Sequence, residues 1–156
     1  KSVGIDVVIS DHHRPQDKIP AAQAVVDPYQ QGCGSPFKGF SGVGVAFKLI
    51  SALEGPGCDM EGLLENYADL VAIGTIADVV PLEGENRAFV KKGLRMLSHT
   101  DRVGIQALLE HAGMDGRQLT AGNIAFTLVP RIKATGRIGG PDRAVSLFIS
   151  EDLEEG

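Results

Sequence analysis

The fold is decided by the stretch Val7-Val8-Ile9-Ser10-Asp11-His12-His13-Arg14-Pro15, in which an apolar run ends in one carboxylate and two adjacent imidazoles. The β-branched residues at its start predict a buried strand of a parallel or mixed sheet. Pro15 predicts that this strand does not continue. In open α/β sheets, ligands gather at the carboxyl ends of the strands. The stretch therefore predicts a functional site at Asp11, His12 and His13.

These three polar residues allow two interpretations. Paired histidines occur in surface turns or as partners of a buried carboxylate, whereas imidazoles beside a carboxylate also suit Mn, Zn or Fe. We favour the metal interpretation. Because three neighbouring residues cannot all close on one ion, we expect further ligands elsewhere in the chain.

Asp78 is the first candidate for such a ligand. It is the only charged residue in the apolar run from Val71 to Leu82, where a lone acid is costly unless it is paired or binds a metal. The dipole at the end of the preceding helix would repel the carboxylate rather than stabilise it.

Composition limits the classes of protein to which the chain can belong. Its 156 residues, 43% of them hydrophobic and 22% charged, fit one ordinary globular domain. With a net charge of −5, any contact with nucleic-acid phosphates is expected to be local or metal-mediated. Two cysteines without a CxxC spacing favour a reducing, cytoplasmic setting. No apolar run is long enough for a membrane span. The chain starts at Lys1 almost directly before a strand, and we expect it to be cut at both ends.

Apolar spacing, caps and breakers predict the remaining elements. A second short strand over Ala24-Val25-Val26-Asp27 should be stopped by Pro28. Ser41 should cap a helix that ends at Gly55. Its early glycines, Gly42 and Gly44, suit either an anion at the helix N-terminus or close helix packing. Further helices are predicted over residues 60–76, 83–99, 104–112, 120–129 and 142–150.

A basic segment lies between the last two predicted helices. Pro130 is expected to halt the helix before it, and residues 130–140 read as a glycine-rich loop that carries Arg131, Lys133 and Arg137. Such a loop suits phosphate recognition. A turn with solvated charges would have the same composition, so the residues alone leave both alternatives open.

Four segments, in this order along the chain, resemble motifs of the DHH phosphoesterase superfamily, and within it those of exonucleases specific for single-stranded DNA. They are Ser10-Asp11-His12-His13, the segment from Ser41 to Leu49, the segment from Gly74 to Leu82, and the segment from Pro130 to Arg137. The resemblance implies an α/β fold with a mostly parallel sheet flanked by helices. Residues 1–82 would form the C-terminal half of a DHH domain, and residues 83–156 a helical continuation toward an interdomain connection.

The resemblance also implies an activity and a set of roles. The family hydrolyses single-stranded DNA from the 5′ end with two divalent cations, Mn2+ or Mg2+, in recombination and repair. His12 and Asp78 match metal ligands, and His13 matches the imidazole near the metal centre and the phosphate. Asp11 is expected to orient a histidine.

The basic segment is assigned by the same resemblance. Arg131 and Arg137 match the DNA-phosphate motif, and Lys133 stands where the family pattern leads us to expect an asparagine. The family's two earlier aspartate motifs are not among these residues, so we expect half a metal site and an inactive chain when it is isolated. Single-stranded DNA is the expected partner, a membrane is not, and protein partners in repair are left open.

Two rival functions are considered. One is a phosphodiesterase of the same superfamily that acts on oligoribonucleotides or cyclic dinucleotides. The other is a non-catalytic nucleic-acid-binding domain, for which substitution of His12 or Asp78 would change nothing.

Overall fold

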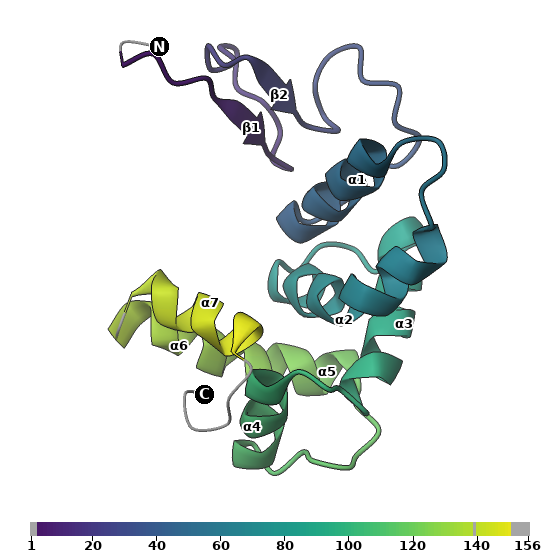
Figure 1. The fold of residues 1–156 in the computed structure, drawn as a ribbon, viewed down its shortest axis with the longest axis vertical. Coiled ribbons are helices and arrows are strands. Elements are labelled where there is room, and N and C mark those ends of the chain that lie inside the picture. Colours follow the sequence, from purple (N-terminus) through teal and green to yellow (C-terminus); the bar gives the residue numbers. More distant parts are fainter. Residues whose placement is uncertain (1–2, 139, 151–156) are drawn as a thin grey trace.

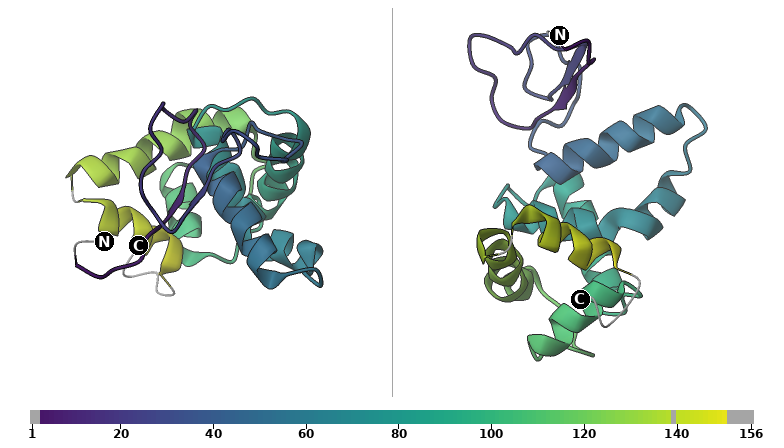
Figure 2. Two further views of the ribbon diagram at one scale, coloured as in Figure 1. Left: turned by 90° about the horizontal axis from the view of Figure 1, so that it is seen from above. Right: turned by 60° about the vertical axis from the view of Figure 1, so that its left-hand side comes forward.

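A small parallel sheet forms one end of the molecule in this computed structural model, which describes residues 3–138 and 140–150, without the side chains of residues 136–138. Strand β1 (Val8–Ser10) pairs in parallel with β2 (Ala24–Val26), with Ile9 opposite Val25. The sheet lies beside α1 (Gly42–Glu54), and the other helices extend away from it (Figure 1; Figure 2). The prediction of an α/β fold with parallel strands is confirmed.

The first strand is not buried, which contradicts the prediction made from its β-branched sequence. Val7 and Val8 are 45% and 62% exposed, and Ile5 is 61% exposed. In the described part of the chain the sheet has two strands, so one edge of β1 and much of its apolar surface meet no neighbour. Residue pattern predicts the strand correctly, whereas burial depends on what packs against it.

The helices begin and end largely where caps and breakers predict. Ser41 caps α1, with its Oγ accepting a hydrogen bond from the Gly44 N–H at 3.3 Å, and Gly55 ends that helix at φ +80°. Asp59 caps α2 in the same way. The helices that follow are α2 (Met60–Ala77), α3 (Gly84–Leu97), α4 (Val103–His111), α5 (Ala121–Asn123), α6 (Val129–Ile138) and α7 (Pro141–Ile149).

Helix α2 runs through the middle of the core, as its apolar surface predicts. One cluster of buried side chains, including Phe47 and Phe89, joins α1, α2 and α3, while a larger one, including Ile105 and Leu128, joins α2 to the later helices. Helix α3 packs directly on α2. The predicted boundary between a DHH part and a helical continuation, placed between residues 82 and 83, stays a prediction. Within the described ranges, no helix is both long and apolar enough to cross a membrane.

Pro130 does not end its helix, so the prediction of a loop at residues 130–140 is wrong. A π-helical turn, η1 (Ile124–Leu128), continues into α6 without a break, and the Val129 N–H donates to the Ile124 carbonyl five residues earlier. In a regular α-helix Pro130 would lack a donor and its ring would clash with the carbonyl four residues before it. The wider π turn accommodates both effects.

Candidate metal centre

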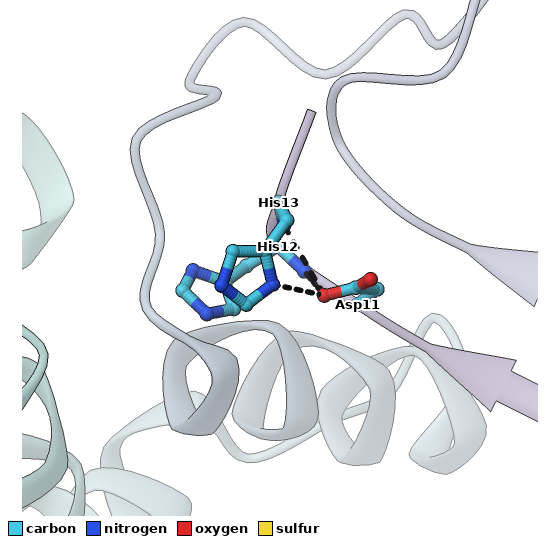
Figure 3. Close-up of side chains that lie close together, drawn as sticks. All are labelled: Asp11, His12 and His13. Carbon is cyan, nitrogen blue, oxygen red and sulfur yellow. Dashed lines mark hydrogen bonds and ion pairs between the residues drawn. The ribbon is translucent and has the colours of Figure 1, made fainter. Parts of the chain in front are cut away.

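The sequence from Asp11 to His13 folds into a tight polar turn directly after β1 (Figure 3). Asp11 Oδ1 accepts hydrogen bonds from the backbone N–H groups of His12 and His13 at 2.7 and 3.2 Å, and lies 2.8 Å from His13 Nδ1. The two imidazole rings are neighbours, with centroids 4.1 Å apart. One carboxylate therefore holds both the turn and the His13 ring in place.

These hydrogen bonds shift two pKa values in opposite directions. The hydrogen bond from the His13 ring, followed by those from the two backbone N–H groups, lowers the pKa of Asp11 to about 2. The same side-chain contact raises the pKa of His13 above its ordinary value. Asp11 thus stays ionised, and His13 keeps its proton to a higher pH than a free histidine.

Asp78 reaches the same place from the end of α2. His12 Nδ1 lies 3.3 Å from Asp78 Oδ2, although the two residues are 66 positions apart in the sequence. The apolar run suggested a buried acid, yet the Asp78 side chain is 36% exposed and the following Val79 is 86% exposed. The Asp78 carboxylate has the His12 ring beside it and is accessible to solvent, so it does not carry the cost of a buried, unpaired charge.

The first turn of α1 forms the floor beneath His12, and sequence analysis did not assign it this role. A Cβ atom at Gly42 would lie 3.5 Å from His12 Cδ2, an ordinary van der Waals distance, so the ring lies beside this turn with room for a methyl group between them. Figure 3 shows both imidazoles beside the beginning of this helix. A second feature missed from sequence is the buried contact between the hydroxyls of Ser41 and Thr75, whose oxygens lie 3.0 Å apart. Nothing in the local sequence pairs residues so far apart.

The basic residues of α6 do not all meet the site. Lys133 Nζ donates to the Ala77 carbonyl at 3.1 Å, immediately before Asp78. Arg131 instead donates to the Thr127 carbonyl of its own helix at 2.7 Å. Arg137 lies in α6 by its backbone, but its side chain falls outside the described part of the chain. The structure therefore brings Lys133, among the predicted phosphate contacts, to the end of α2 that carries Asp78.

The donor set at this position fits a divalent cation. One ligand atom each from Asp11, His12 and His13 lies within 4.8 Å of the others, and Asp78 approaches His12 from the opposite element. Two ligands of one octahedral cation stand about 3 Å apart when each lies about 2.1 Å from the ion, which is close to the spacing between His12 Nδ1 and Asp78 Oδ2. A mixed set of imidazole nitrogen and carboxylate oxygen suits Mn2+, Fe2+ or Zn2+.

A cleft of about 440 Å³ opens beside this cluster, between the carboxyl ends of the strands and the loop that follows β1. Exposed cations line part of it. Its polar lining includes Asp11, His13, Arg14, Gln16, Lys18 and Asp27. A volume of this size falls within the usual range for small-molecule sites.

Comparison with known sequences gives consistent relatives. Residues 1–75 match the model of the DHH family, N-terminal domain. The chain is 46% identical over 155 residues to the single-stranded-DNA-specific exonuclease RecJ of Bacillus subtilis, covering 99% of this chain and 19% of that protein. It is 40% identical over 165 residues to RecJ of Escherichia coli, covering 99% of this chain and 29% of that protein. The chain thus spans less than a third of the length of these relatives.

Two solved structures share the fold. The crystal structure of RecJ in complex with Mn2+ from Thermus thermophilus matches 99% of this chain and 22% of its own, with a TM-score of 0.79 at 38% identity. A crystal structure of exonuclease RecJ bound to manganese matches 97% of this chain and 37% of its own, with a TM-score of 0.80 at 40% identity. These alignments extend beyond the DHH match at residues 1–75 and take in nearly all of the helical region.

Proposed function

We propose that this chain, whose residues 1–75 match the model of the DHH family, N-terminal domain, supplies one side of the active site of a metal-dependent exonuclease that degrades single-stranded DNA from its 5′ end. The observation that carries the proposal is the convergence of His12 and Asp78, which lie 3.3 Å apart from two different elements. Relatives of known name support the substrate, since those from Bacillus subtilis and Escherichia coli are single-stranded-DNA-specific exonucleases.

In this proposal His12 and Asp78 hold one of two divalent cations, Mn2+ or Mg2+. When bound, such cations lower the pKa of the attacking water and offset charge on the phosphoryl oxygens. Ligands from outside these 156 residues would complete the pair of sites. The isolated chain is therefore expected to release few or no nucleotides.

His13 has a separate role in the proposed reaction. Asp11 engages its Nδ1 at 2.8 Å and raises its pKa, which leaves Nε2 as the ring nitrogen available to a phosphate oxygen. A protonated imidazole at this position would donate a hydrogen bond to the scissile phosphate or a proton to the leaving oxygen. Asp11 acts through this ring by fixing its orientation.

Phosphates that flank the scissile bond need a cationic surface, which the net charge of −5 does not supply as a whole. We assign this part to Lys133, which is exposed beside the end of α2, and to Arg14 and Lys18 in the cleft next to His13. Arg131 and Arg137 complete the predicted set on α6. A cytoplasmic location, expected from the two free cysteines, is consistent with such an enzyme.

The test is Mn2+-dependent release of nucleotides from 5′-phosphorylated single-stranded DNA by the full-length protein. The variants His12→Ala and Asp78→Ala should each lose more than about a hundredfold in rate, since even indirect partners of a metal ligand cost 10–100-fold. His111→Ala and Asp115→Ala make the same changes at exposed positions at the end of α4 and shortly after it, and should leave the rate unchanged. Helix α4 lies at the end of the molecule opposite the sheet (Figure 1).

The rival functions predict different results in this assay. Equal rates in all four variants would indicate a non-catalytic nucleic-acid-binding domain. A preference for dinucleotides over longer single-stranded DNA would indicate a phosphodiesterase of the same superfamily with a small substrate. Loss of activity at His12 and Asp78, with a preference for long DNA, supports the exonuclease.

A further inference from the structure

A pair of buried hydroxyl groups connects the start of α1 to the end of α2 near the candidate metal centre. Ser41 and Thr75 are 1% and 0% exposed, and their oxygens lie 3.0 Å apart. Ser41 Oγ also accepts the Gly44 N–H of its own helix. A buried hydroxyl without a partner is costly, so the Thr75 hydroxyl depends on Ser41 for its place in the core.

Each hydroxyl belongs to a helix turn that lies beside His12 or leads to Asp78, the two converging residues. Ser41 directly precedes Gly42, beside which the His12 ring lies. Thr75 lies three positions before Asp78, in the last turn of α2. The hydrogen bond between them therefore joins the turn that supports His12 to the turn that carries Asp78.

Close packing between α1 and α2 leaves little freedom for any other arrangement of the two helices. A Cβ atom at Gly74 would lie 2.6 Å from Val43 Cγ1, closer than side chains pack. The Val43 side chain of α1 thus packs directly on the Gly74 backbone of α2, and the hydroxyl pair adds a directional bond one residue along α2. Both contacts oppose a movement of one helix along the other.

We propose that the Ser41–Thr75 hydroxyl pair is a positioning device that fixes His12 relative to Asp78 for cation binding. This inference depends on the proposed function for the identity of the bound ion. The positions of His12 and Asp78 relative to the hydroxyl pair do not depend on that function. Neither hydroxyl touches the ion or the substrate. Loss of the pair should therefore weaken cation binding through a small displacement of His12, beyond any effect on stability.

The experiment compares Mn2+ binding by calorimetry in the full-length protein and three variants. Thr75→Val keeps the shape of the side chain but removes the hydroxyl, and should lower Mn2+ affinity about tenfold, the lower end of the effect of indirect ligand partners. Thr75→Ser restores the hydroxyl and should bind as the original protein does. Ile105→Val removes a methylene from a fully buried residue in the other core cluster, and should cost stability without changing affinity.

A second measurement separates this inference from the proposed function. The ring resonances of His12 in the metal-free protein, followed by NMR of histidine-labelled samples, should shift in Thr75→Val while those of His111 do not. If the original protein binds no Mn2+, the proposed function fails, and the His12 resonances alone decide the positioning role. Affinity within twofold of the original in Thr75→Val, or unchanged His12 resonances, would overturn the inference.

Discussion

Replacing Val79 by glycine should stabilise the protein, although glycine usually weakens a fold. Val79 follows Asp78 at the end of α2 and has φ +57°, the one non-glycine residue with positive φ among the residues that the structure describes. This left-handed conformation costs an ordinary residue about 1–2 kcal/mol, and a β-branched side chain is unfavourable there. The side chain is 86% exposed, so burial does little to offset the strain.

The net effect follows from three contributions. Glycine removes the left-handed penalty of about 1–2 kcal/mol and loses about 0.5–1 kcal/mol through its greater freedom in the unfolded chain. The buried seventh of the side chain contributes about 0.3 kcal/mol at most, scaled from full burial. We therefore expect Val79→Gly to raise the free energy of unfolding by about 0.5 kcal/mol.

Urea unfolding followed by circular dichroism measures this change, and Val79→Ala is the matched control. Alanine shortens the side chain but keeps the Cβ atom that causes the strain, so its free energy of unfolding should stay below that of the glycine variant. Asparagine tolerates the left-handed region better than most residues and should fall between the two. A glycine variant less stable than the alanine variant would refute the reasoning.

The remaining predictions concern two ion pairs of different burial and the titration of His13 and Asp11. Arg102→Ala should cost about 3 kcal/mol in urea unfolding, because it leaves the Asp69 carboxylate, 4% exposed and 2.7 Å from the guanidinium, without its cation. Lys92→Ala breaks a 3.8 Å pair with Glu65, whose side chain is 66% exposed, and should cost under about 0.5 kcal/mol. NMR titration should place the pKa of His13 above 6.5, and Asp11→Asn should return it toward that value. The raised pKa of His13 stabilises the fold below pH 6.5, and this stabilisation is lost as the pH rises through the pKa of the folded protein. The lowered pKa of Asp11 stabilises the fold above pH 3.8, and this stabilisation is lost as the pH falls through about 2.

The helices were predictable because their signals are local. Ser41 and Gly55 are the cap and the stop that short-range hydrogen bonding and positive φ require, and the structure uses both. Asp78 could be found for a related reason, since one charge inside an apolar run needs a partner wherever the chain goes. The structure supplies such a partner in His12, whose Nδ1 lies 3.3 Å from the Asp78 carboxylate. The sequence contains no signal for this distance.

Three features lay beyond local reasoning. The exposure of Val8 depends on what covers the strand, which a β-branched pattern cannot specify. Pro130 is a breaker only in a regular α-helix, and the π turn before it removes the conflict. The contact between Ser41 and Thr75 joins residues 34 apart, and the serine is fully explained locally as a cap, so nothing in the sequence demanded a second partner.

The helical conformation of residues 129–138 changes how the basic residues can act. In a loop, Arg131, Lys133 and Arg137 could all turn toward one phosphate. On a helix, residues two apart point to different sides, and the contacts divide accordingly: Lys133 reaches the Ala77 carbonyl beside Asp78, while Arg131 bonds to its own helix. A cation at the C-terminal end of α2 also offsets the negative end of the helix dipole next to the Asp78 carboxylate. Of these two cations, Lys133 is therefore the one that lies beside Asp78, as the proposed roles of Asp78 in metal binding and of Lys133 in phosphate binding require.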